Sequence, residues 1–252
     1  MALIKNPIPI LEYDDNPQAV LMPDRAHLYQ FPEYAVFPFL GDEVERYAKR
    51  HHCPKIGEFE TITKIFPIYQ VSYGGKELCL CQAPLGGAAA AQFLDFLIGY
   101  GARKIISAGS CGALVPIEEN QFLIPTEALR DEGASYHYLP ASRTVQADPA
   151  AVAAIEKAMK KNGFSWQECR TWTTDGFFRE TKDLVAYRRE EGFSVVEMEC
   201  ASLFACAQFR NVTFGQFLFT ADTLADIQDD RDWGEKSYAP ALQICLDAAV
   251  QL

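Results

Sequence analysis

Short apolar runs alternate along this chain with segments that carry helix start and stop signals, and this alternation constrains the fold more than any other feature. KIISA (Lys104–Ala108) is typical of a buried strand, and it follows a helical run that opens at Gly86-Gly87 and ends at Gly101. Asp148-Pro149 opens another helix, with an N-cap acid and a first-turn proline. Together with a hairpin at Gly74-Gly75, this order predicts an α/β fold with a mixed central β-sheet flanked by helices.

The N-terminal part of the chain differs from the rest. Residues 1–32 contain Pro7, Pro9, Pro17, Pro23 and Pro32 and show no helical or strand periodicity, which predicts an irregular arm. Residues 33–252 carry the alternation without a linker or an internal repeat, and we predict that they form one domain.

The composition narrows the class of protein. The formal net charge is -11, which argues against nucleic acid or an anionic membrane as the main partner and leaves a small molecule as the expected one. The eight cysteines form no C-x-x-C pair and no Cys/His cluster, so we expect reduced thiols, no metal, no cofactor and a cytoplasmic location. The N-terminus lacks a signal-peptide pattern, and no run is long enough to span a membrane.

Two local predictions concern the strands around the expected site. After residue 54 we predict strands at Ile62–Phe66, Ile68–Tyr73 and Leu78–Ala83. After the strand at Lys104–Ala108, the small residues Gly109–Gly112 predict a tight turn whose backbone N–H groups could approach an anion or a sugar.

The segment VVEMECAS (Val195–Ser202) places two acids between an apolar strand and a small-residue helix, where acids are rarely found. Ionised carboxylates accept hydrogen bonds, and the vicinal hydroxyls of a ribose donate them, so Glu197 and Glu199 would suit the mouth of a sugar site. The alternative is that both acids only complement the positive end of the following helix.

Two further positions could contribute chemistry. Asp222 ends an apolar strand, where ligands bind in α/β sheets, and a desolvated aspartic acid could give a proton to a leaving group. Its alternative role is an N-cap. Phe177 follows another strand and could stack on a flat ring, although ordinary core packing explains it equally well.

KIISAGSCGAL (Lys104–Leu114), VVEMECAS and TADT (Thr220–Thr223) together resemble the nucleoside phosphorylase family, from about Tyr34 to the C-terminus. That family contains purine nucleoside phosphorylases, uridine phosphorylases and the methylthioadenosine/adenosylhomocysteine nucleosidases. The resemblance implies a nucleoside phosphorylase-like fold and cleavage of an N-glycosidic bond, by a pentosyltransferase or by a nucleosidase. It also implies a dimer-based homo-oligomer, such as a hexamer, and a place in purine salvage.

The resemblance also implies roles for individual residues. The ribose would be bound by Met198 and Glu199, and by His27 from a neighbouring subunit. The base would contact Phe177 and Glu197. Phosphate would be bound by Gly41, Arg46 and Ser110, and by Lys64 from a neighbouring subunit. Asp222 would protonate or hydrogen-bond purine N7 as the base leaves. A surface position for His27 in a loose arm is the alternative.

The nucleophile and the base both stay open at this point. Glu45 stands where the phosphorylases carry an arginine, and Ser107 replaces a second arginine. Two like charges 4 Å apart repel by about 4 kcal/mol at an effective dielectric of roughly 20, which disfavours phosphate and suggests Glu45 as the general base for water. The purine reading rests on Asp222, whereas the loop Arg130–Pro140 resembles that of the uridine enzymes. The alternatives are therefore a uridine phosphorylase or a non-catalytic nucleoside-binding relative.

Overall fold

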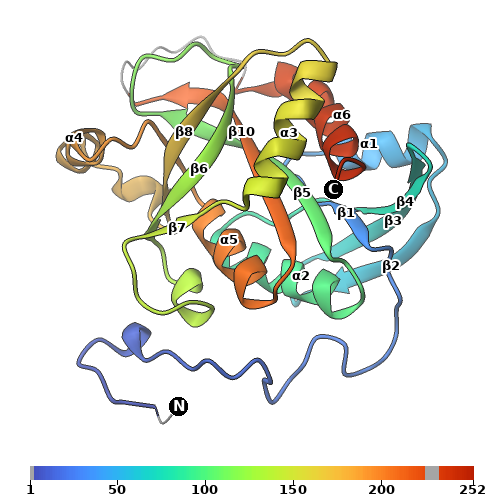
Figure 1. Ribbon diagram of the computed structural model, residues 1–252, viewed down its shortest axis with the longest axis horizontal. Coiled ribbons are helices and arrows are strands. Elements are labelled where there is room, and N and C mark those ends of the chain that lie inside the picture. The colour runs from blue at the N-terminus through green and yellow to red at the C-terminus, as the bar shows by residue number, and fades with distance from the viewer. Residues whose placement is uncertain (1–2, 225–232) are drawn as a thin grey trace.

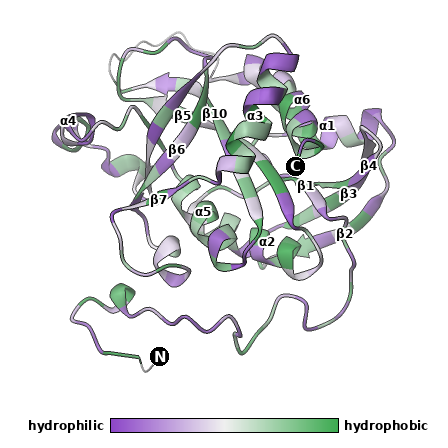
Figure 2. Ribbon diagram, in the orientation of Figure 1, coloured by the Kyte–Doolittle hydropathy of each residue, from purple (hydrophilic) through white to green (hydrophobic). Residues whose placement is uncertain are grey.

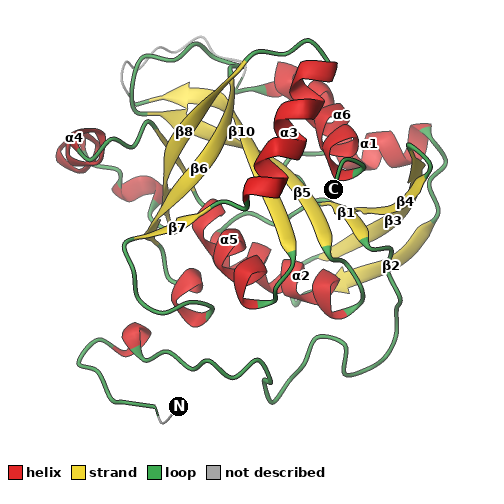
Figure 3. Ribbon diagram, viewed as in Figure 1, coloured by secondary structure: helices red, strands yellow, loops and turns green. Residues whose placement is uncertain are grey.

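The computed structural model describes residues 3–224 and 233–252, which form one mixed β-sheet with helices on both sides (Figure 1; Figure 3). The strands are β1 (Tyr34–Val36), β2 (Lys55–Glu60), β3 (Ile65–Tyr73), β4 (Lys76–Leu80), β5 (Lys104–Ala113), β6 (Phe122–Asp131), β7 (Thr144–Gln146), β8 (Trp166–Thr174), β9 (Val195–Glu197) and β10 (Thr213–Thr223). The helices are α1 (Glu43–Arg50), α2 (Gly87–Gly99), α3 (Pro149–Lys161), α4 (Lys182–Glu190), α5 (Cys200–Phe209) and α6 (Tyr238–Ala249). Single 3-10 turns are η1 (Pro9–Leu11), η2 (Ala134–His137), η3 (Phe177–Arg179) and η4 (Glu235–Ser237). The α/β fold with a mixed sheet is as the sequence predicts.

The strand order lets part of the sheet close on itself. It runs β10-β6-β8-β9-β5-β1-β4-β3-β2, and β10 also pairs in parallel with β5 along almost its full length. Strands β5, β9, β8, β6 and β10 therefore form a closed ring, from which the remaining strands extend as an open sheet. β5 lies between β1 and β10 at its beginning and between β9 and β10 at its end.

Two helical layers cover the sheet. Helices α3 and α6 pack together on one face, and α2 and α5 pack together on the other (Figure 1). The α2 ribbon is largely hydrophobic (Figure 2), and its residues Phe93, Leu94 and Leu97 join the largest core cluster. α4 lies at the periphery of the molecule (Figure 1).

Local chemistry sets the ends of these helices. The Asp148 carboxylate accepts a 2.8 Å hydrogen bond from the backbone N–H of Ala150, so α3 starts where the sequence predicts. Gly86 precedes α2 with a φ of 91°, which favours glycine. A side chain at Gly87 would put its Cβ 2.2 Å from the Ser202 hydroxyl, so the first turn of α2 can approach α5 only without one.

The two local strand predictions are wrong in part. The predicted turn Gly109–Gly112 lies inside β5, because β10 pairs along this stretch and β9 pairs with Gly112 at its end. The predicted strand Ile62–Phe66 instead contains the turn between β2 and β3. There the Thr61 hydroxyl accepts the backbone N–H of Lys64 and donates to its carbonyl oxygen.

Residues 3–32 contain no regular element except η1, and they lie along the side of the molecule near α2 and α5 (Figure 1). The Tyr13 hydroxyl donates to the Tyr138 carbonyl oxygen, Arg210 donates to that of Pro17, and the Phe31 N–H donates to that of Tyr100. The arm is therefore fixed to the domain at several points. Within the described residues, no helix has the length and apolar character needed to cross a membrane.

Candidate active site

The candidate site lies at the carboxyl end of β5, where three strands meet. Gly112 pairs with Val196 of β9 on one side and with Asp222 of β10 on the other. A Cβ added to Gly112 would come within 2.9 Å of Asp222 Oδ1 and 3.2 Å of Val196 Cγ1. The absent side chain of Gly112 thus makes room for the Asp222 carboxyl group next to the apolar Val196 side chain.

Glu197 is buried and held by protein groups. Its carboxylate accepts hydrogen bonds from the hydroxyls of Thr171 (3.1 Å) and Thr173 (2.6 Å) on β8, and from the backbone N–H groups of Glu199 and Cys200 (both 2.6 Å) at the start of α5. Burial raises the pKa of Glu197, and these four hydrogen bonds oppose that rise. The carboxylate joins the β8–β9 pair to the N-terminus of α5.

Glu199 is the N-cap residue of α5, and its side chain points to the start of the other helix of the same layer. Its carboxylate accepts a 2.6 Å hydrogen bond from the backbone N–H of Gly86, the N-cap residue of α2. Burial, followed by the charge of Glu197, raises the pKa of Glu199 to about 8. Met198 between the two acids is only half-buried. Backbone hydrogen bonds from Gly86 and Met198 stabilise the charged form of Glu199, whereas Glu197 accepts four hydrogen bonds, so the Glu199 carboxylate keeps more acceptor capacity for a ligand.

The segment from Asp175 to Glu180 links the two ends of the site. The charge of Asp175 contributes to the raised pKa of Glu199. At the other end, burial and then the charge of Asp222 raise the pKa of Glu180 to about 7. Phe177 lies between them on η3 and is 52% exposed, so its ring is free to meet a ligand rather than packed in the core.

Three of the predicted phosphate residues, Gly41, Arg46 and Ser110, lie near the same end of β5, and the one cation among them, Arg46, is already paired. The Phe39 N–H donates to the Ala108 carbonyl oxygen, so the chain runs beside β5 towards Gly41, and the Ser110 side chain is exposed. Arg46, on the first turns of α1, forms ion pairs with Asp42 (2.6 Å) and Glu43 (2.8 Å).

Glu45 is solvent-exposed, and its carboxylate forms a 2.7 Å ion pair with Lys49. Its part in activating water therefore stays a prediction.

Two predicted residues lie away from this end of β5 within one chain. His27 lies beside Gly99 and Tyr100, at the opposite end of α2 from Gly86. A helix of this length separates the two places by roughly 20 Å. Lys64 follows the exposed Ile62 in the turn between β2 and β3. Neither residue joins the carboxylates unless a second subunit brings it there.

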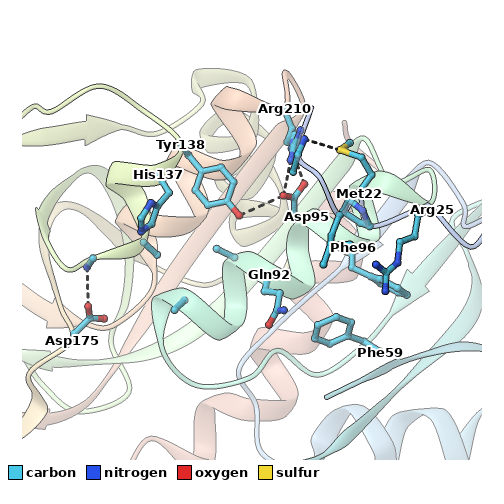
Figure 4. Close-up of a pocket in the computed structure, with 17 residues that line it drawn as sticks. Met22, Arg25, Phe59, Gln92, Asp95, Phe96, His137, Tyr138, Asp175 and Arg210 are labelled. Carbon is cyan, nitrogen blue, oxygen red and sulfur yellow. Dashed lines mark hydrogen bonds and ion pairs between the residues drawn. The ribbon is translucent and has the colours of Figure 1, made fainter. Parts of the chain in front are cut away.

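A cavity of about 650 Å³ lies next to the site rather than in it. Figure 4 shows it between the arm (Met22, Arg25) and α2 (Gln92, Asp95, Phe96). Asp175 lines one part of it, whereas neither Glu199 nor Asp222 does. In its wall, Arg210 holds Asp95 with hydrogen bonds of 2.7 and 2.9 Å.

Sequence reasoning missed the residues that position the acids. Thr171 and Thr173 hold Glu197 across the β8–β9 pair, and Gly86 holds Glu199. The alternating threonines of RTWTT could have indicated two hydroxyls on one strand face, but not which carboxylate they meet. The sequence indicates Gly112 only as part of a turn, because its position between β9 and β10 depends on the pairing of strands that are distant in sequence.

Seven of the eight cysteines are buried, and all eight are free thiols. Among residues 3–224 and 233–252 there is no group of three or more His, Cys, Asp or Glu side chains placed to hold a metal ion.

Comparison of the sequence with known proteins identifies its family. The model of a family described as the phosphorylase superfamily matches residues 33–251. A guanosine phosphorylase of Halorubrum lacusprofundi is 26% identical over 184 residues, covering 73% of this chain and 75% of that protein. A uridine phosphorylase of Haemophilus influenzae is 30% identical over 145 residues, covering 57% and 56%.

Among solved structures, an AMP nucleosidase from Bacteroides thetaiotaomicron aligns with a TM-score of 0.73 and 22% identity, covering 90% of this chain and 94% of that one. This likeness concerns the fold.

Proposed function

Since the chain belongs to the phosphorylase superfamily, we propose that it is an enzyme that cleaves the N-glycosidic bond of a purine nucleoside. One observation carries the proposal: Gly112 of β5 pairs with Asp222 on one side and with Val196 of β9 on the other, and Glu199 caps α5 directly after β9. A nucleoside has a hydroxyl-rich sugar and a flat base, and these two ends match the two carboxyl groups.

At the sugar end, the carboxylate form of Glu199 accepts hydrogen bonds from the ribose 2′- and 3′-hydroxyls, while Met198 packs on the ring. Glu197 keeps its original assignment near the base edge, but its four protein hydrogen bonds favour an indirect role. It fixes the N-terminus of α5 and so positions Glu199.

At the base end, Asp222 acts as the acid. The bond between C1′ and the base nitrogen breaks with its electron pair going to the base, and the Asp222 proton goes to purine N7. The nucleophile then bonds to C1′ of the cation-like ribosyl group. Delivering a proton where negative charge develops stabilises the transition state rather than the substrate. The Phe177 ring stacks on the base.

The purine assignment rests on Asp222, because a pyrimidine leaving group offers no N7 to protonate. The guanosine and uridine phosphorylases among the relatives show that both base classes occur in the family. The carboxyl group of Glu180, close enough to respond to the charge of Asp222, adds a second polar group at the base end.

For the nucleophile, the charges favour water. Arg46 is already neutralised by Asp42 and Glu43, and Ser107 donates its hydroxyl proton to the Phe37 carbonyl oxygen. Binding a phosphate dianion calls for fixed cations in the site. Phosphate is the second candidate, favoured by the names of the relatives, and would use Gly41, Ser110 and Arg46, with Lys64 from another subunit.

We also propose that the protein forms a homo-oligomer. His27 and Lys64 can contribute only to a neighbour's site, and Ile62 is fully exposed in the turn that carries Lys64. Apolar residues exposed at such a turn suit contact with a second copy of the chain.

The proposal is tested by incubating a panel of purine and pyrimidine nucleosides with the enzyme, with and without phosphate, and identifying the sugar product. Free ribose from a purine nucleoside in phosphate-free buffer is expected. Ribose 1-phosphate formed only with phosphate would replace water by phosphate, and absence of turnover for every nucleoside would reject the enzymatic function.

A further inference from the structure

A buried glutamine lies in the apolar layer beneath the site. Gln216 of β10 is 2% exposed and pairs with Ser107 of β5. Its neighbours on the same strand face, Phe214 and Leu218, belong to the main apolar core. Neither Nε2 nor Oε1 of its amide has a hydrogen-bond partner among the residues that the structure describes. Buried polar groups in proteins are almost always satisfied, so an amide in this position calls for a partner.

The amide faces the nucleophile side of the site. Its Nε2 lies 3.4 Å from the place where a Cβ on Gly109 would be, and Phe39 Cδ2 lies at the same distance from that place. Gly109 directly precedes Ser110, and Phe39 lies two residues before Gly41. Phe39 is partly exposed, so this space adjoins the surface at the end of β5.

The two polar side chains beside Gly109, those of Ser107 and Gln216, are both uncharged. The Ser107 hydroxyl donates its proton to the Phe37 carbonyl oxygen at 2.7 Å and keeps only lone pairs for another partner. The Gln216 amide offers two N–H donors and one acceptor. A water molecule both donates and accepts hydrogen bonds, so it can satisfy the Gln216 amide and the Ser107 oxygen together. A phosphate dianion offers mostly acceptor oxygens, and these would face the Ser107 oxygen and the Gln216 carbonyl oxygen, which are acceptors too.

We infer that the Gln216 amide and the Ser107 hydroxyl hold a water molecule over Gly109, and that Gln216 is a positioning residue that favours water over phosphate as the nucleophile. The inference rests on the proposed cleavage of a nucleoside and deepens it. The reaction balances as nucleoside plus water giving ribose plus free base: the bond from C1′ to the base breaks, the water oxygen bonds to C1′, the base takes the proton of Asp222, and Asp222 regains a proton from solvent as the attacking water loses one.

The test compares Gln216→Met, which keeps the length and removes the polar atoms, with wild type and with Gln208→Met, a control on the exposed side of α5. Each protein is given one purine nucleoside at fixed phosphate, and free ribose and ribose 1-phosphate are quantified. We expect hydrolytic kcat of Gln216→Met to fall at least tenfold and the ratio of ribose 1-phosphate to ribose to rise, with Gln208→Met unchanged.

A stability effect alone cannot produce a change in the product ratio. An unchanged ratio in a folded, active Gln216→Met variant would overturn the inference while leaving the proposed cleavage intact, and inactivity of the wild type would instead reject the cleavage. Should Gln216→Met fail to fold, a high-resolution crystal structure of the wild type decides. A water within hydrogen-bond distance of the Gln216 amide and Ser107 Oγ supports the inference, and its absence there overturns it.

Discussion

The Glu199 carboxylate accepts a 2.6 Å hydrogen bond from the backbone N–H of Gly86, so the residues that cap α5 and α2 are joined directly to each other. This bond holds one oxygen of a carboxylate that is buried in the protein, since Glu199 is only 6% exposed. It also makes the position of Glu199 independent of the surface loops, because both helix starts are anchored in the core layer.

Replacement of Glu199 by Gln tests the sugar end. The Gln Oε1 can still accept from Gly86, so the fold is retained, but the charge that binds the ribose hydroxyls is lost. Hydrogen bonds to a charged group contribute about 1.5–3 kcal/mol each, so KM should rise on the order of tenfold to a hundredfold. The control is a 2′-deoxynucleoside, for which the loss should be smaller. Equal losses for both sugars would contradict contact with the 2′-hydroxyl.

The pKa of Glu199 predicts how activity depends on pH. Because burial raises it to about 8, the carboxylate form that accepts both ribose hydroxyls is depleted as pH falls below about 8. We expect kcat/KM to rise with pH towards about 8 as Glu199 ionises, and to fall again at the pH where Asp222 loses the proton that it must donate. The Glu199→Gln variant should lose this rise, and a wild-type profile flat from pH 6 to 9 would contradict the assignment.

The same shift predicts an opposite trend in stability. The folded pKa of Glu199 lies above its unfolded value, so the folded protein binds the extra proton between those two pKa values. Stability is then highest below the unfolded pKa and falls as pH rises towards about 8. The melting temperature of wild type should decline over this range more than that of Glu199→Gln, as differential scanning calorimetry can measure.

Removal of the Glu197 carboxylate should mainly lower the stability of the folded protein. Glu197→Ala leaves two buried threonine hydroxyls and two backbone N–H groups without their acceptor, at a cost of about 3 kcal/mol or more. For a chain of this size that lowers Tm by roughly 6–12 °C. An unaltered Tm with altered base preference would instead show that Glu197 contacts the base directly.

Gly112→Ala tests the space beside Asp222. Its Cβ, at the carboxyl end of β5, would lie 2.9 Å from Asp222 Oδ1, so the carboxyl group must move away from the base. We expect kcat with a purine nucleoside to fall on the order of a hundredfold, approaching the loss in Asp222→Asn, with the far-ultraviolet circular dichroism unchanged. Full activity in Gly112→Ala would show that Asp222 acts from another position or not at all.

The sequence predicted the helices near the site better than the strands. α2 begins at the predicted Gly86-Gly87 pair and α3 at the predicted Asp148-Pro149, because the glycine turn and the N-cap acid with its first-turn proline are local signals. The stretch Gly109–Gly112 is strand because β10, far away in sequence, pairs along all of it and β9 pairs with Gly112 at its end. The contrast between Glu197 and Glu199 also depends on tertiary structure, since Thr171, Thr173 and Gly86 come from other elements.

The most direct measurement of the central claim is a crystal structure with a purine nucleoside analogue whose N-glycosidic bond resists cleavage. The account predicts the 2′- and 3′-hydroxyls within hydrogen-bond distance of Glu199 and purine N7 within the same distance of Asp222. A nucleoside bound instead in the cavity along α2, touching neither carboxyl group, would contradict it.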